Sequence, residues 1–146
     1  MKITFKGDYA LKTLLDLALN YDSGLVTILD ISKRMDIPKK FLEQVLLDLK
    51  KGGFVNSKRG KEGGYYLAKK PDEIRIGDVI RFIDGPIEPI ACVNDTYGGC
   101  KDLSKCVFRK IWVKTSDAVS AVVDNITLED LVRDVSGHNR ILNYSI

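Results

Sequence analysis

The sequence predicts a mainly α-helical protein with a small β-hairpin, built as a winged helix-turn-helix domain followed by a long dimerisation helix. Three observations lead to this fold class. Two short amphipathic segments separated by a tight turn occupy residues 27–51, and a glycine-tipped pair of short strands follows at residues 54–67. Apolar residues then recur with heptad spacing over residues 106–126, which is typical of a helix that packs against a second helix.

The first three predicted helices each carry an apolar stripe at helical spacing. The helix over residues 8–21 has Asp8 as a candidate N-cap, and its apolar face is formed by Leu11, Leu14, Leu15 and Ala18. A second helix opens at Thr27, whose hydroxyl and Asp30 are spaced as a capping box. The third helix occupies residues 38–51, and its core stripe consists of Leu42, Val45, Leu46 and Leu49.

The β-hairpin follows the third helix directly. Strands are expected at residues 54–57 and 65–67, joined by a turn-rich tip at residues 59–64. Beyond the hairpin we expect a short strand at residues 74–76 and a short helix at residues 78–83.

The long helix has two apolar stripes. One seam steps by four and three residues and consists of Phe108, Trp112, Thr115, Val119, Val122 and Ile126. Ile111, Ala118 and Ala121 lie off this seam and are expected to face the chain's own core. Two stripes on one helix indicate a dimer, and the alternative is a helix buried inside its own domain. Thr127 then caps a last short helix, and the tail from Ser136 is poorly specified.

Positive charge is concentrated in the first half of the chain. Residues 1–70 hold 14 Lys and Arg against 8 Asp and Glu, or +6, and residues 71–146 hold 9 against 12, or −3, which gives the total of +3. Between Lys33 and Lys70 the balance is 11 to 4, or +7. This distribution favours an anionic partner, double-stranded DNA first, over the alternative of a solvated basic surface.

Several classes of protein do not match the sequence. The start resembles no signal peptide, and the apolar runs fall far short of the roughly 20 residues of a membrane span, so we expect a cytoplasmic protein without membrane association. A nucleophile–base pair and a phosphate loop are missing, and His138 is the one histidine of the chain. We therefore expect neither an enzyme nor a small-molecule substrate.

Candidate DNA-contacting residues lie on the third helix and on the hairpin. A helix fits the major groove, where Gln44 can pair with adenine, Glu43 can accept from cytosine N4, and Lys40 can reach guanine or phosphate. The hairpin carries three further basic residues, Lys58, Arg59 and Lys61, and Arg59 is suited to the minor groove. The alternative is that these side chains only face solvent.

Three cysteines, Cys92, Cys100 and Cys106, are crowded into a Gly- and Asp-rich loop. An odd number in one short stretch argues against a disulfide framework and indicates metal or thiol chemistry. The spacing differs from a CxxC zinc knuckle, so an iron–sulfur cluster, zinc, and reactive or inert thiols all remain open.

We divide the chain into a winged helix-turn-helix domain (1–85), a cysteine-rich cluster-binding loop (86–106), and a dimerisation helix with the C-terminal segment (107–146).

Four segments resemble, in register, the family that contains the IscR, NsrR and CymR regulators: residues 1–10 (MKITFKGDYA), 41–44 (FLEQ), 59–65 (RGKEGGY) and 127–131 (TLEDL). The resemblance spans residues 1–132. It implies a homodimer on a partly palindromic DNA site that acts mainly as a repressor. It also implies an iron–sulfur cluster on the three cysteines, which senses cluster status, oxidants or nitric oxide. The sequence does not decide between a 2Fe–2S and a 4Fe–4S cluster, and we favour 2Fe–2S.

The fourth cluster ligand is not evident from the cysteines. In the IscR-type branch a histidine lies three residues after the last cysteine, but here Arg109 stands there, and a guanidinium does not bind metal. In the NsrR-type branch an acidic residue of the other subunit's first helix serves, and Asp8 stands at the matching position. His138 is disfavoured because of its place in the tail. The alternative function is a cluster-free regulator of sulfur or cysteine metabolism that is controlled by a partner protein, as in CymR-type members.

Overall fold

The computed structural model describes residues 1–144, with side chains described as far as residue 138. In chain order its elements are α1 (Phe5–Leu19), η1 (Tyr21–Ser23), α2 (Ile28–Met35), α3 (Lys39–Lys51), β1 (Val55–Lys58), β2 (Gly64–Leu67), η2 (Pro71–Glu73), α4 (Ile76–Asp84), η3 (Ala91–Val93), α5 (Val107–Val123) and α6 (Leu128–Tyr144). This order of helices, hairpin and long helix confirms the predicted fold class. In the part of the chain that the structure describes, every helix is too short or too polar to cross a membrane.

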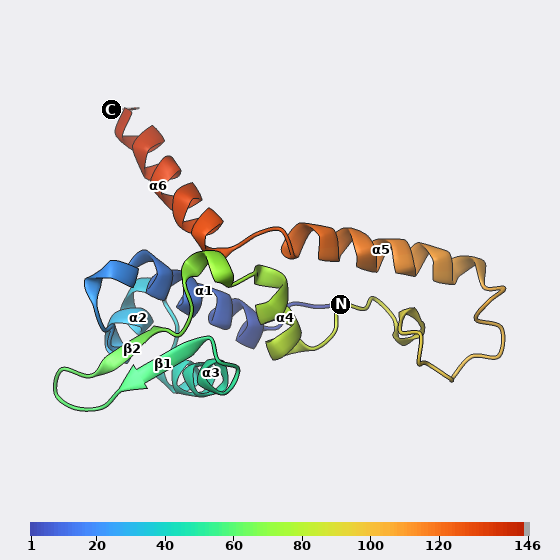
Figure 1. Ribbon diagram of the computed structural model, residues 1–146, viewed down its shortest axis with the longest axis horizontal. Coiled ribbons are helices and arrows are strands. Elements are labelled where there is room, and N and C mark those ends of the chain that lie inside the picture. The colour runs from blue at the N-terminus through green and yellow to red at the C-terminus, as the bar shows by residue number, and fades with distance from the viewer. Residues whose placement is uncertain (145–146) are drawn as a thin grey trace.

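Helix α1 lies at the centre of the fold and packs against α2, α3, α4 and α6 (Figure 1). It begins at Phe5 because Thr4 has extended backbone and its hydroxyl accepts a hydrogen bond from the Gly7 N–H. Its buried apolar side chains are Ala10, Leu14, Leu17 and Ala18. Together with residues such as Ile31, Leu46, Val79 and Leu128 they form one hydrophobic core, in which burial of each large side chain contributes roughly 1.5–3 kcal/mol.

A tight turn over residues 36–38 joins α2 to α3. Asp36 ends α2 in the left-handed conformation, with φ of 53°. Ile37 is buried, its N–H donates to the Ser32 carbonyl, and the Ser32 hydroxyl donates to the Ile37 carbonyl at 2.7 Å. Pro38 then precedes the first turn of α3, where its fixed φ suits the start of a helix. The turn therefore fixes the direction in which α3 leaves α2.

The wing is a two-stranded antiparallel hairpin held at its base by the core. Val55 of β1 lies opposite Leu67 of β2, and both side chains are buried. Val26, just before α2, adds a bridge to Tyr65 through two backbone hydrogen bonds of 3.0 and 2.8 Å. The tip extends beyond the body of the protein (Figure 1).

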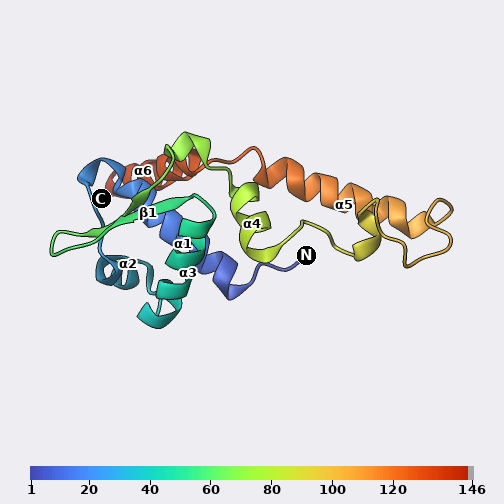
Figure 2. The same ribbon diagram turned by 60° about the horizontal axis from the view of Figure 1, so that its bottom comes forward.

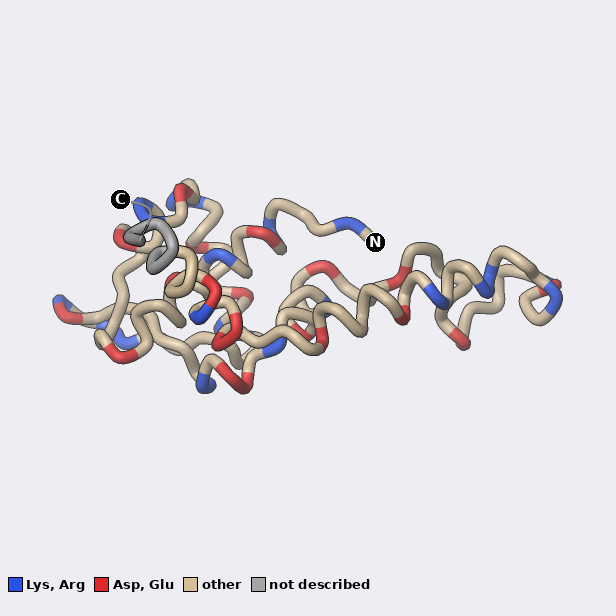
Figure 3. The backbone as a smooth tube through the Cα atoms, turned by 90° about the horizontal axis from the view of Figure 1, so that it is seen from above, with Lys and Arg blue, Asp and Glu red and all other residues tan. Residues whose placement is uncertain are grey.

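Helix α5 forms an arm that projects from this body: the segment before it runs outward along the arm, with η3 in contact with α5, and α5 runs back to the body (Figures 1 and 2). Basic and acidic residues are interspersed along the arm (Figure 3). The guanidinium of Arg81 on α4 donates to Asp124 at the C-terminal end of α5, with distances of 2.6 and 2.9 Å. These hydrogen bonds hold the pKa of Asp124 below its usual value, and they fix the arm to the body.

Three local predictions are wrong. The strand expected at residues 74–76 is a single bridge between Arg75 and Thr127, because α4 already begins at Ile76. The last helix is not short: α6 has 17 residues and continues past Ser136, since its first turns pack against α1. Asp8 is not an N-cap, because α1 begins before it and Thr4 is the cap.

Candidate nucleic-acid interface and cysteine loop

The exposed face of α3 carries the predicted base readers Lys40, Glu43 and Gln44, while the opposite face is buried in the core. The Gln44 side-chain amide donates to Asp48 at 3.2 Å. Asp48 is paired with Lys6 of α1, and this contact lowers the pKa of Asp48. The amide of Gln44 is therefore oriented by a carboxylate that is itself held by α1.

The wing presents Lys58, Arg59 and Lys61, all exposed, as predicted from the sequence. Its tip depends on glycine: Gly60 has φ of +119°, and a Cβ on Gly63 would lie 2.2 Å from the Lys58 carbonyl oxygen. Such a contact is impossible without opening the turn, so glycine lets the backbone fold tightly there. The tip thus brings the three cations together on a short turn.

Direct contacts join α3 and the wing into one surface. The Lys50 ammonium on α3 donates to the Ser57 hydroxyl on β1 at 2.8 Å. Between them lies an open hollow of about 350 Å³, and Glu43, Lys58 and Arg59 line it. Glu43 of α3 and the wing cations Lys58 and Arg59 therefore flank the same hollow.

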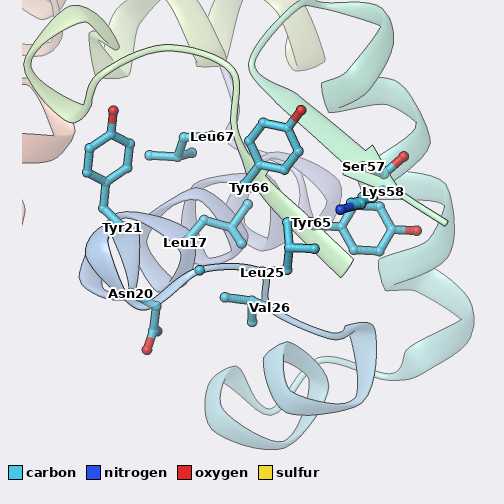
Figure 4. Close-up of a pocket in the computed structure, with 11 residues that line it drawn as sticks. Leu17, Asn20, Tyr21, Leu25, Val26, Ser57, Lys58, Tyr65, Tyr66 and Leu67 are labelled. Carbon is cyan, nitrogen blue, oxygen red and sulfur yellow. The ribbon is translucent and has the colours of Figure 1, made fainter. Parts of the chain in front are cut away.

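A second open hollow, of about 680 Å³, lies on the other side of the hairpin (Figure 4). Leu17 and Val26 contribute apolar lining, and three tyrosines, Tyr21, Tyr65 and Tyr66, surround the opening.

An ion pair between the buried Asp16 and the exposed Arg34 joins α1 to α2, and sequence reasoning missed it. Asp16 is 1% exposed, and both of its carboxylate oxygens accept from Arg34, at 2.8 and 2.9 Å. A planar guanidinium bound to both oxygens fixes the relative orientation of the two helices. The signal was present in the sequence, since Asp16 interrupts an otherwise apolar stretch between Leu15 and Leu17.

The three predicted cluster ligands lie on one loop, but the structure does not gather all three at one point. Cys92 in η3 and Cys106 at the N-cap of α5 are partly buried, Cys100 is exposed, and all three are free thiols. Within the described residues, the structure brings no three Cys, His, Asp or Glu side chains together in a group suited to a metal ion. The ligand assignment therefore stays a prediction.

Arg109, at the position where a ligating histidine was considered, is engaged with this loop. Its Nε donates to the Cys92 carbonyl at 2.8 Å, and its Nη2 donates to Asp95 at 2.9 Å. The one histidine of the chain, His138, lies on α6. This helix projects from the body at the end of the molecule opposite to the cysteine loop (Figure 1).

Asp8 lies in the first turns of α1 with a side chain that is 47% exposed, and it forms an ion pair with Lys12 at 2.8 Å. This contact raises the pKa of Lys12. Asp8 also lines an open hollow of about 600 Å³ together with Ile3 and Phe5. Its carboxylate is therefore accessible from outside the chain.

The apolar seam expected on α5 is only partly exposed in the structure. Val119 and Ile126, which were assigned to the dimer seam, pack against the chain's own core. Ile111, Ala118 and Ala121, which were assigned to the core, are exposed. Four of the six expected seam residues, Phe108, Trp112, Thr115 and Val122, are exposed, and with Ile111 and Ala118 they form the exposed apolar stripe of α5. The wrong assignment arose because heptad spacing alone does not say which stripe faces the body.

Comparison with known proteins decides the family. The Rrf2 family model, described as an iron-dependent transcriptional regulator, matches residues 3–134. The chain belongs to the Rrf2 family. It is 40% identical over 142 residues to the HTH-type transcriptional regulator IscR of Escherichia coli, which covers 94% of this chain and 86% of the relative.

Solved structures of Rrf2-type regulators share the fold. CymR, the global cysteine regulator of B. subtilis, matches with a TM-score of 0.77 and 34% identity over 91% of this chain and 97% of that chain. T. potens IscR matches with a TM-score of 0.75 and 32% identity over 92% and 88%. This Rrf2 protein is therefore a DNA-binding transcriptional regulator, and the expectation that it is not an enzyme agrees with the regulators it resembles.

Proposed function

We propose that this Rrf2 regulator is a homodimer that binds a partly palindromic DNA site, mainly as a repressor, and that an iron–sulfur cluster controls its binding. One observation carries the proposal: the three cysteines lie on a single loop that leads directly into α5, the helix with an unpartnered apolar stripe. Loop state and dimer geometry would therefore be coupled. The boundaries 1–85, 86–106 and 107–146 separate the corresponding reading, sensing and dimerisation parts.

In the proposed complex, α3 enters the major groove and the wing follows the backbone beside it. Gln44 pairs with adenine, Glu43 accepts from cytosine, and Lys40 contacts guanine or phosphate. Lys58 and Lys61 neutralise phosphates, and Arg59 reaches into the minor groove. The Lys50–Ser57 hydrogen bond supports this reading because it fixes the wing against the helix.

The donor set of the loop fits an iron–sulfur cluster chemically. Cys92, Cys100 and Cys106 offer three free thiols, and thiolates are the usual ligands of such clusters. Because Cys100 is exposed while the other two are partly buried, the loop has to close by bringing Cys100 inward. Bound there, a cluster supplies a redox-sensitive centre that oxidants or nitric oxide can destroy. We favour the 2Fe–2S form over 4Fe–4S.

We propose Asp8 of the partner protomer as the fourth ligand. The exposed carboxylate beside an open hollow supports this, because a loop of a second chain can reach it there. Lys12 has to release the carboxylate first. A hard carboxylate oxygen holds iron less firmly than a thiolate does, which suits a cluster that must be lost to give a signal.

A continuous series of contacts supports signal transfer from the loop to the DNA-reading surface. Cys106 caps α5, whose far end is bound through Asp124 to Arg81 of α4. The end of α4 contacts the start of α1, where the Thr4 N–H donates to Asp84 at 3.2 Å. Helix α1 in turn holds α3. A shift of α5 would therefore move the elements that carry α3.

The alternative is a cluster-free regulator of sulfur or cysteine metabolism that is controlled by a partner protein. The structural likeness to CymR, with a TM-score of 0.77, favours it. The three cysteines argue against it, because that mode of control does not need them.

Cluster content separates the two functions. Protein purified without oxygen is expected to be brown, with iron and acid-labile sulfide in equal amounts. Each of Cys92→Ser, Cys100→Ser and Cys106→Ser is expected to lose the colour. Ser104→Ala, in the same loop, is the matched control and keeps it. A colourless parent protein with stoichiometric DNA binding would instead support the cluster-free alternative.

A further inference from the structure

The guanidinium of Arg109 ties the segment around Cys92 and Asp95 to the start of α5, although these residues are 17 and 14 positions from Arg109 in sequence. Arg109 lies in the first turn of α5, three residues after Cys106, and its side chain is 25% exposed. It donates to the backbone carbonyl of Cys92 at 2.8 Å and to the carboxylate of Asp95 at 2.9 Å. The Asp95 side chain is 96% exposed even with this ion pair present, so the contact with Arg109 is its main contact with the rest of the protein.

These two hydrogen bonds place Cys92 beside the start of α5. Residues three apart on a helix are neighbours, so Arg109 and the N-cap residue Cys106 lie on the same side. Cys92 and Cys106 are both partly buried, whereas Cys100, which lies between them in sequence, is exposed. The loop therefore has two fixed cysteines and one free one.

We infer that Arg109 is a positioning residue that holds Cys92 and Cys106 together as a pre-organised pair of cluster ligands, an inference that rests on the proposed function. A guanidinium is always protonated and has donors in a fixed fork, so it can hold a carbonyl and a carboxylate at once without competing for iron. The hydrogen bonds take the place of the tie that a ligating side chain at this position would provide. The pair forms before metal arrives, and only Cys100 and the fourth ligand have to close on it.

Loop closure gives the expected size of the effect. Bringing together the ends of a free loop of about 14 residues is disfavoured by a factor on the order of 50, since the factor scales as roughly the three-halves power of loop length. Loss of the Arg109 tie is therefore expected to weaken capture of a reagent that needs both thiols by about tenfold or more.

The test uses the metal-free protein with Cys100→Ser, so that one pair of thiols remains, and phenylarsine oxide, which binds two neighbouring thiols. Arg109→Ala and Arg109→Lys are each expected to bind the arsenical at least about tenfold more weakly than the parent, because lysine lacks the fork. Lys110→Ala, the adjacent exposed residue, is the matched control and is expected to bind like the parent. Circular dichroism checks that the variants are folded.

The outcomes separate this inference from the proposed function. Unchanged arsenical binding in Arg109→Ala would overturn the positioning role, and parent-like binding in Arg109→Lys would show that charge alone acts. In the full-cysteine protein, a cluster that forms in the parent and is lost faster in Arg109→Ala supports both. A parent that never forms a cluster, with the arsenical difference intact, would overturn the proposed function and leave the Arg109 tie supported.

Discussion

Replacing Val122 with glutamate is expected to dissociate the proposed homodimer. Val122 is the last residue of the exposed stripe of α5, near the C-terminal end of the helix, and it is 60% exposed in the single chain. In a symmetric dimer the same substitution occurs twice, so two carboxylates would meet an apolar interface. Val119, at the centre of the originally expected seam, is unsuitable for this test because it packs against its own core.

The exposed fraction of the Val122 side chain sets the expected loss of dimer stability. Full burial of a valine side chain is worth about 1.5 kcal/mol, so the 60% that remains exposed offers about 1 kcal/mol per protomer and about 2 kcal/mol per dimer. Two uncompensated carboxylates add at least as much again. The total of about 4 kcal/mol corresponds to a dimer Kd raised about 1,000-fold.

Sedimentation velocity over a range of protein concentrations measures this Kd. Lys110→Glu introduces the same side chain on α5 outside the stripe, and it controls for the change of charge. Val122→Glu is expected to sediment as a folded monomer at concentrations where the parent and Lys110→Glu are dimers. A Val122→Glu protein that dimerises as tightly as the parent would refute the assignment of this stripe to the interface.

Four further variants probe the proposed DNA-contacting surface, the arm and the proposed fourth ligand. Gln44→Ala should weaken binding to a specific DNA site by about 1–3 kcal/mol and leave binding to random DNA nearly unaffected. Lys58→Ala should weaken binding to both kinds of DNA alike and reduce the slope of the logarithm of the binding constant against the logarithm of the salt concentration by about one. If the two variants lost affinity for the specific site and for random DNA in the same pattern in mobility-shift assays, these roles would be contradicted. Asp124→Asn should lower the melting temperature by roughly 2–4 °C at pH 7, because the partly exposed pair with Arg81 contributes about 1 kcal/mol. The pKa of Asp124 is lowered by folding, so its contribution is present above the unfolded value of about 4 and is lost as the pH falls through the folded pKa. A melting difference that does not shrink as the pH is lowered below about 4 would argue against the ion pair. Asp8→Asn should shorten the lifetime of the cluster while leaving thermal stability near that of the parent, since Thr4 and not Asp8 caps α1, and an unchanged lifetime would place the fourth ligand elsewhere.

Local sequence patterns predicted most of the structure of α2, α3 and the wing. The apolar stripe of α3 and the glycine-rich turn of the wing each specify their structure within a few residues, so Lys40, Gln44 and Arg59 were expected where they lie, exposed. Thr27 also caps α2 as expected, accepting from the Asp30 N–H at 3.2 Å. Capping, turn chemistry and periodicity are local effects, and a single sequence records them directly.

Contacts between distant segments were not predictable in the same way. The links of Arg81 with Asp124 and of Arg109 with Cys92 join residues 43 and 17 positions apart, and the pattern around each residue is unremarkable. The prediction of which residues of α5 face the body was partly wrong for the same reason. Two apolar stripes were visible in the sequence, but the body that Val119 contacts is built by other helices. The N-cap was misplaced because both Thr4 and Asp8 are suitable cap residues, and the contact of Thr4 with Asp84 is tertiary.

The most direct test of the account measures DNA binding by one anaerobic preparation before and after its cluster is removed. A binding site is first obtained by in vitro selection from a random DNA pool, and affinity is followed by fluorescence anisotropy alongside visible absorption and the iron and sulfide content. We predict a brown protein whose affinity for the selected site changes at least about tenfold when the cluster is lost, which equals about 1.4 kcal/mol of coupling. Identical affinity in the brown and colourless forms would contradict control by the cluster.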